Sequence, residues 1–216
     1  MIAKINIGYE TSWREMADDL RTGTENYALN SGSIVDARLT DGRVIEFKVC
    51  RDERGKVFFL SNNITFRHRM NERDTNAGGW RDSEMRSYLQ DEIYPLLSDE
   101  LRSVIQPTRI VQVLNGERIE TLDKLFIPSR TQMFGIGDYS DAEPEDTQLD
   151  IFHCNLDRVK ARGGDPCWYW LRSPALGYTT YFMFVNNGGN LYYYTGASSN
   201  YGVCLGFSIE ENEILF

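Results

Sequence analysis

Carboxylates gather in one short stretch of the chain and could supply oxygen ligands to a calcium ion. They are Asp138, Asp141, Glu143, Glu145, Asp146 and Asp150. An EF-hand arranges such ligands around a glycine at the sixth position of a twelve-residue loop, and this stretch has no glycine there. Charge runs are more often solvated. We therefore predict a solvated loop over residues 135–150 and no metal.

Cysteine and histidine are the other side chains that could carry chemistry. His153 and Cys154 are neighbours, but a zinc site needs about four ligands, and neither histidine has a partner at ligand spacing. Cys167 or Cys154 could pair with His153 as a nucleophile, yet the chain has no Gly-x-Ser-x-Gly elbow. No Cys-x-x-Cys pair occurs, which indicates reduced thiols. The sequence predicts no cofactor and no catalytic residue.

A long uncharged segment near the C-terminus is the third candidate. Residues 173–209 contain no charged side chain, although charged residues make up 25% of the chain. The segment is rich in Tyr, Asn, Ser, Thr and Gly, a composition that gives binding loops rigid contact area and adaptable hydrogen bonds. An ordinary sheet surface explains the aromatic residues, but not the loss of the charges that keep exposed strands soluble. We favour a binding surface.

The elements that must position these residues follow from hydrophobic periodicity, capping residues and turn signals. Helices are predicted at residues 11–22, capped by Thr11 or Ser12, from Asp82 or Ser83 to Pro95, and at 98–105. Strands are predicted at 34–39, 44–49 and 57–60 as a meander, and at 122–127, 180–185, 191–194 and 202–209. Along the chain, a β-meander is followed by helices and then by a C-terminal part that contains only strands. This order predicts an α+β fold with a largely antiparallel sheet.

Length and charge narrow the function further. The chain has 216 residues, enough for one large domain or one domain with a small appendage. Its net charge is 23 − 32 = −9, which disfavours nucleic acid and anionic membranes as partners. The first residues have no apolar core of a signal peptide, and no segment is long enough for a membrane span. We expect a protein made in the cytoplasm without membrane insertion.

Four motifs together resemble a known family. They are residues 79–89 (GWRDSEMRSYL), 121–129 (TLDKLFIPS), 169–174 (YWLRSP), and 182–189 with Tyr-Gly-Val at 201–203. This combination resembles the uncharacterised "YWLRSP" domain family, which is related to the C-type-lectin-like fold of formylglycine-generating enzymes. The resemblance implies an α+β, C-type-lectin-like fold with a mixed, mainly antiparallel sheet and two helices. That domain would cover residues 31–216, with residues 1–30 as an N-terminal helix and lead-in.

Some members of this fold group are variable proteins of diversity-generating retroelements. Their C-terminal region is diversified at adenine-containing codons, and residues 175–205 resemble such a region. One departure is Cys204-Leu205 after Gly202-Val203, where the family usually continues with Arg-Pro. Formylglycine-generating enzymes use two nearby C-terminal cysteines, but Cys167 and Cys204 are far apart. The Glu-Pro-Asn and Trp-Asn-Asp motifs of calcium-dependent lectins are absent.

The resemblance and the composition together predict a non-enzymatic ligand-binding protein, bacterial or of a phage, whose partner is a protein or a glycan. We expect Trp80, Trp168 and Trp170 in the core, and Arg172 in a buried ion pair or bound to backbone carbonyls. Two alternatives stay open: an enzyme or metal-dependent member of the formylglycine-generating group, and a structural phage or cell-surface module. The predicted ligand-binding residues are Tyr178, Thr179, Tyr181, Asn187, Asn190, Tyr192, Tyr194, Ser198, Asn200 and Tyr201.

Overall fold

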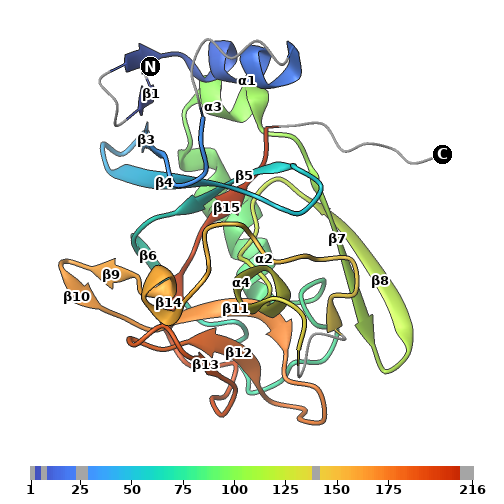
Figure 1. The fold of residues 1–216 in the computed structure, drawn as a ribbon. Coiled ribbons are helices and arrows are strands. Elements are labelled where there is room, and N and C mark those ends of the chain that lie inside the picture. Colours follow the sequence, from blue (N-terminus) through green and yellow to red (C-terminus); the bar gives the residue numbers. More distant parts are fainter. Residues whose placement is uncertain (1–2, 6–8, 23–28, 138–141, 210–216) are drawn as a thin grey trace.

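The computed structural model describes residues 3–5, 9–22, 29–137 and 142–209, and it has an α+β architecture with mostly antiparallel sheets (Figure 1). The first sheet has six strands in the order β15-β5-β4-β3-β1-β2. These strands are β15 (Gly206–Phe207), β5 (Val57–Ser61), β4 (Val44–Arg51), β3 (Ile34–Arg38), β1 (Ala3–Ile5) and β2 (Tyr9–Thr11). The predicted meander is confirmed as β3, β4 and β5, which pair antiparallel in sequence order.

The second sheet has five strands in the order β13-β12-β11-β14-β6. They are β13 (Leu191–Tyr192), β12 (Phe182–Val185), β11 (Tyr169–Pro174), β14 (Tyr201–Val203) and β6 (Phe66–His68). The Tyr-Trp-Leu-Arg-Ser-Pro motif forms the central strand β11, and all its residues are buried. Its pairing with β14 is parallel, whereas its pairing with β12 is antiparallel. The sheet is therefore mixed.

The chain passes between the two sheets twice, from β5 to β6 and from β14 to β15. The expected single strand over residues 202–209 is therefore wrong, because it divides between the sheets. The expected alternation fails as well, since Cys204, Gly206 and Ser208 are buried like their neighbours. A segment between two layers has no solvent face. Here Phe207 stacks on Phe59 with ring centroids 5.0 Å apart.

Short helices cover the sheets. The predicted helices at 11–22 and 98–105 are confirmed with shorter bounds, whereas the one predicted to end at Pro95 is a run of three short helices that continues to Leu96. These helices are α1 (Trp13–Thr22), the run α2 (Glu84–Tyr88), η1 (Leu89–Ile93) and η2 (Tyr94–Leu96), and α3 (Asp99–Val104). Ser12 and Glu15 form a capping box on α1, and Ser83 and Ser98 cap α2 and α3. Trp13 of α1 meets Phe59 and Phe207 edge-on, so the N-terminal helix packs on the same core as the rest.

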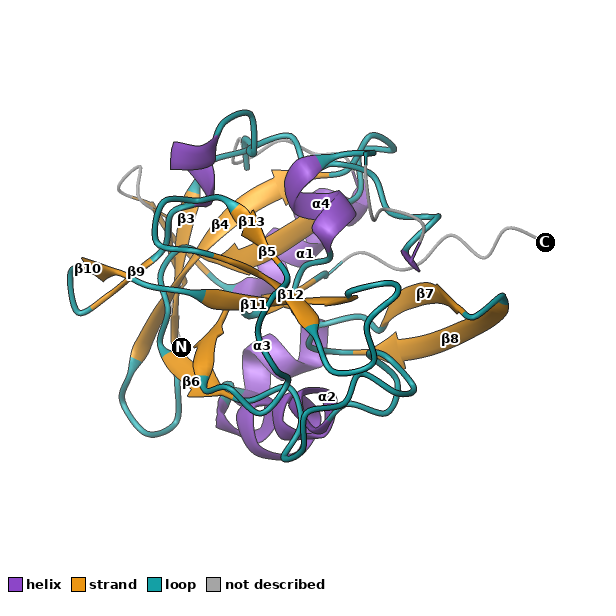
Figure 2. Cartoon of the chain, turned by 90° about the horizontal axis from the view of Figure 1, so that it is seen from below, coloured by secondary structure: helices purple, strands orange, loops and turns teal. Residues whose placement is uncertain are grey.

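Several elements were not predicted from the sequence. A hairpin joins β7 (Thr108–Leu114) to β8 (Glu117–Asp123), and a smaller one joins β9 (Ala161–Arg162) to β10 (Asp165–Pro166). Figure 2 shows the two hairpins projecting from opposite sides. The short helices α4 (Arg130–Phe134) and η4 (Asn155–Arg158) were also missed. The predicted buried strand at 122–127 is wrong, because Leu122 is 65% exposed on the first hairpin and β8 ends at Asp123. No helix in the described ranges combines the length and apolarity needed to cross a membrane.

Candidate ligand-binding surface

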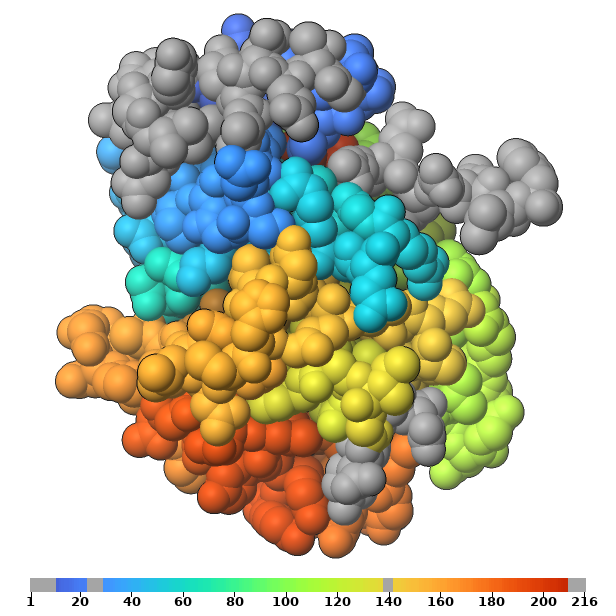
Figure 3. Space-filling view, viewed as in Figure 1, coloured from blue at the N-terminus to red at the C-terminus, as the bar shows by residue number. Residues whose placement is uncertain are grey.

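The predicted ligand-binding residues lie on β13, at the start of β14 and in the loops between β11 and β14, at the end of the molecule drawn orange and red in Figure 3. All of them are exposed except Tyr181 and Tyr201, which are partly exposed. β12 itself, Phe182–Val185, is completely buried. The segment 175–205 therefore combines a buried strand with exposed tyrosine and asparagine side chains.

Four tyrosines form one contiguous patch on this surface. The ring centroid of Tyr178 lies 5.3 Å from that of Tyr181 and 6.3 Å from that of Tyr194. Tyr193 packs against Tyr194 at 4.1 Å, and their hydroxyls are hydrogen-bonded at 2.7 Å. Tyr193 is not among the predicted ligand-binding residues, because the side chain of Tyr193 would point away from those of Tyr192 and Tyr194 in an alternating strand. We call these four residues the tyrosine patch.

A second aromatic group corrects one prediction about the core. Trp80 and Trp170 are buried as expected, but Trp168 is 42% exposed. Trp168 directly precedes the first residue of β11, and its ring contacts those of Phe184 and Tyr201. The Trp168 centroid is 5.2 Å from Phe184 and 5.3 Å from Tyr201. Trp168 therefore adds exposed aromatic area beside the predicted residues.

The backbone of this surface is held from outside by the segment between β6 and α2. The Asn76 side-chain amide donates to the carbonyls of Tyr178 (2.7 Å) and Tyr181 (2.9 Å). Asp74 accepts from the backbone N–H of Ser198 at 2.9 Å, and hydrogen bonds from the side chain and the backbone of Ser198 lower the pKa of the Asp74 carboxyl. The exposed side chain of Tyr178 is thus not the group that fixes the loop conformation there.

The turn between β12 and β13 is fixed by the Asn186 side chain and by a glycine that no other residue can replace. Asn186 Oδ1 accepts from the N–H groups of Gly188 (2.9 Å) and Asn190 (3.0 Å). Gly189 has φ +76°, and a Cβ there would lie 1.8 Å from the carbonyl oxygen of Asn155. Only glycine fits that position. Among the predicted residues in the turn, Asn190 is engaged with Asn155 at 2.7 Å, whereas Asn187 is at the exposed tip.

The acidic segment is not the solvated loop that the sequence suggested. Asp138 and Asp141 lie outside the described residues, but the other carboxylates bind protein groups. Glu145 pairs with Arg109 and Arg118, and Asp150 accepts from the backbone of Arg51. No group of three His, Cys, Asp or Glu side chains that could hold a metal is found in the described ranges. Neighbouring arginines therefore account for much of this acidic run.

The structure confirms the buried contacts predicted for Arg172, the arginine of the Tyr-Trp-Leu-Arg-Ser-Pro motif. It is 1% exposed, and its guanidinium donates to the Ile127 carbonyl and to Gln132 Oε1, each at 2.8 Å. It also pairs with the Asp146 carboxylate. Glu143 lies close by, fully buried, accepting from Gln112 and from Ser173 Oγ at 2.8 Å each. The centre of the second sheet is therefore a buried polar network that supports the exposed surface.

Burial raises the pKa of Glu143 to about 7, against lowering by Arg172 and by its hydrogen bonds. Its contribution to stability is fully present below the unfolded-state pKa of 4.5 and is lost as the pH rises through 7. We expect wild-type stability, relative to Glu143→Gln, to fall by about 3 kcal/mol between these limits. Glutamine stays neutral and can keep both hydrogen bonds. Denaturant unfolding at a series of pH values measures this difference.

The exposed Glu117, at the start of β8, supplies a matched control. Glu117→Gln should follow the wild-type pH profile. Parallel profiles for the wild type and Glu143→Gln would show that the buried carboxyl titrates alike in the folded and unfolded chains, contrary to its burial.

Comparison with known proteins gives one match. Residues 54–211 match the family model described as "Domain of unknown function (DUF6273)", and this span covers both the meander's last strand and the whole second sheet. No curated protein matches the chain. No solved structure matches it.

Proposed function

We propose that this chain, which belongs to the family "Domain of unknown function (DUF6273)", is a non-enzymatic ligand-binding protein. Its binding surface is the exposed part of residues 175–205, and its ligand is a protein or a glycan on another surface. The observation that supports this is the tyrosine patch on an uncharged segment whose backbone is held by Asn76 and Asp74. Exposed tyrosines on a fixed backbone bind partners at a low entropy cost.

We further propose a C-type-lectin-like scaffold and a variable protein of a diversity-generating retroelement. The motif resemblance supports both, and the mixed, mainly antiparallel sheet is compatible with the first. The retroelement proposal is supported by the different residue types at the exposed and the buried positions of residues 175–205. Tyr, Asn and Thr are encoded only by codons that contain adenine, and these types dominate the exposed positions. Phe codons contain none, and Phe182 and Phe184 are buried.

The DNA beside the coding region tests the retroelement proposal. We expect a near-copy of the codons for residues 175–205 that differs only at adenines, next to a reverse transcriptase gene. Sequencing the locus in several isolates should show substitutions at exposed positions such as Tyr178 and Tyr194. Isolates that differ equally at codons without adenine, with no such copy nearby, would contradict diversification and leave ligand binding as a separate question.

A further inference from the structure

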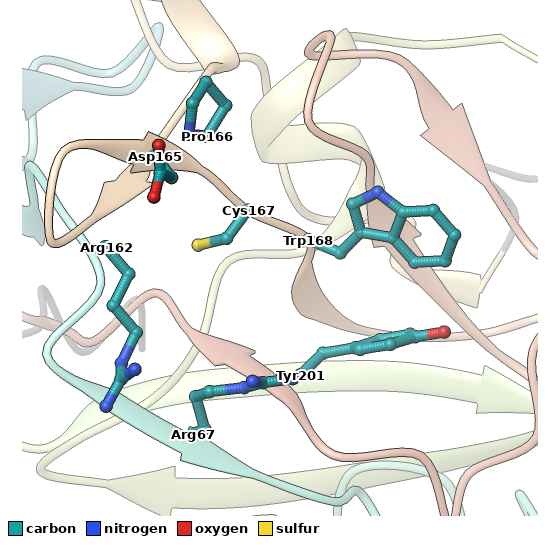
Figure 4. A pocket seen from close by; sticks show the side chains of 7 residues that line it. All are labelled: Arg67, Arg162, Asp165, Pro166, Cys167, Trp168 and Tyr201. Atoms are coloured by element: carbon teal, nitrogen blue, oxygen red, sulfur yellow. The ribbon is translucent and has the colours of Figure 1, made fainter.

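A hollow of about 360 Å³ lies beside the proposed binding surface, where the β9–β10 hairpin meets the start of β11 (Figure 4). Its lining residues are Arg67, Arg162, Asp165, Pro166, Cys167, Trp168 and Tyr201. Of these, Tyr201 alone is among the ligand-binding residues predicted from the sequence. Figure 4 shows Cys167 between Arg162 and Trp168, with the indole of Trp168 and the ring of Tyr201 on the same side.

The hollow carries positive charge on a protein whose net charge is −9. Within the described part of the chain, the Arg162 side chain makes neither an ion pair nor a hydrogen bond, and the Arg67 side chain donates to the Asn200 carbonyl without an ion pair. Burial raises the pKa of the Cys167 thiol, while Arg67, Arg162 and Lys160 oppose the rise. Two guanidiniums and the carboxylate of Asp165 leave one net positive charge on the lining.

The opposite wall of the hollow is aromatic. Trp168 and Tyr201 meet edge-on at 72°, Phe184 stacks on Trp168, and Trp168 is still 42% exposed. Beyond Trp168, the buried ring of Phe184 lies 5.8 Å from Tyr192, which is 46% exposed. Two exposed rings thus flank Phe184 and lead from the hollow onto the proposed binding surface.

We propose that this hollow binds an acidic sugar, with its carboxylate on Arg67 and Arg162 and its ring against Trp168. Guanidinium groups bind carboxylates through paired hydrogen bonds. One net positive charge matches one carboxylate better than a phosphate monoester, which carries nearly two negative charges at neutral pH. The uncharged Asn and Ser side chains nearby suit the hydroxyls of further sugar rings. This inference rests on the proposed function and names the chemical class of the ligand.

Cys167 allows a direct test on the full-length chain, because it lines the hollow and Cys154 is an exposed reference. Alkylation is followed at each cysteine by mass spectrometry. We expect the rate with anionic iodoacetate, relative to neutral iodoacetamide, to be severalfold higher at Cys167 than at Cys154. Added salt should reduce this preference. Glucuronate should protect Cys167 from iodoacetamide and leave Cys154 unaffected, whereas glucose and acetate should protect neither.

Two variants test the arginine wall and the aromatic wall of the hollow separately. Arg67→Gln with Arg162→Gln should abolish both the iodoacetate preference and the protection. Both side chains are exposed, so thermal unfolding should change little. Trp168→Ala should abolish protection by glucuronate and keep the iodoacetate preference. Loss of the preference in Trp168→Ala, or its survival in the arginine variant, would overturn the assignment of the two walls.

The choice of ligand decides the remaining outcomes. Equal protection by acetate and glucuronate, stronger protection by adenosine monophosphate, or no protection would each overturn the acidic-sugar proposal. The proposed function is tested apart from this, through the tyrosine patch. Binding that depends on Tyr178 and Tyr194 but not on Arg67 and Arg162 would retain the proposed function and reject the hollow as its sugar site.

Discussion

Replacing Arg172 by alanine is expected to lower the free energy of unfolding by about 3–5 kcal/mol, as found when one partner of a buried ion pair is removed. The substitution leaves the partly buried Asp146 without its cation, and it leaves Gln132 Oε1 and the buried Ile127 carbonyl without the Arg172 donor. Unsatisfied buried acceptors are costly, so the effect exceeds the loss of one net hydrogen bond. Urea unfolding followed by tryptophan fluorescence measures it.

Two variants control for this result. Arg172→Lys keeps the charge but lacks the planar fork, so it should recover only part of the lost stability. Arg118→Ala removes an arginine that also pairs with carboxylates, Glu120 and Glu145, but whose side chain is 46% exposed. Its cost should stay within about 1 kcal/mol. Equal losses for Arg172→Ala and Arg118→Ala would mean that the buried network does not stabilise the fold.

Local patterns predicted the parts of the fold that depend on local signals. The meander follows from alternating residues around Asp41-Gly42 and Gly55, and both glycines adopt positive φ in their turns. Ser12, Ser83 and Ser98 each precede a helix, as capping residues should. The β7–β8 hairpin has an equally local signal, Asn115-Gly116, with Asn115 at φ 51°. It is not among the predicted elements, because the apolar run after Leu122 indicates a separate buried strand there.

The acidic segment could not be predicted correctly from its own residues. Its carboxylates pair with side chains that are distant in sequence, such as Arg109 on β7 and Arg172 on β11. A charge run appears solvated until those partners are known. The prediction that Trp168 lies in the core is wrong for a related reason. Its exposure depends on where β11 begins and on which residues pack against its ring.

The exposure of the candidate site residues could be anticipated from composition, but the grouping of those residues could not. The tyrosine patch joins Tyr178 and Tyr181, from the loop before β12, to Tyr193 and Tyr194, which follow β13. The hollow needs Arg67 of β6 and Arg162 of β9, two strands that belong to different sheets. Such groupings depend on strand order, which a single sequence does not determine.

Replacing Trp170 by alanine should also be severe, at about 3–5 kcal/mol for a core tryptophan. The indole is fully buried, its ring lies 4.9 Å from Tyr201, and its N–H donates to the carbonyls of His68 and Ser199. It therefore supports the loop that carries part of the proposed binding surface. Trp170→Phe keeps most of the apolar area and loses the hydrogen bonds, so about 1 kcal/mol is expected for it.

The combined variant Tyr178→Ser, Tyr192→Ser and Tyr194→Ser gives the contrasting result that the binding proposal requires. These residues are 41%, 46% and 62% exposed, so the effect of each change should stay within about 0.5 kcal/mol, with the melting temperature nearly unchanged. Binding to ligands found for the wild type on glycan and protein arrays should nevertheless be lost, since aromatic anchors carry most interface energy. Leu122→Ser, an exposed apolar change on the β7–β8 hairpin, should keep that binding. A triple variant that unfolds as readily as Trp170→Ala would show that the tyrosines belong to the core, because an exposed binding surface contributes little to folding.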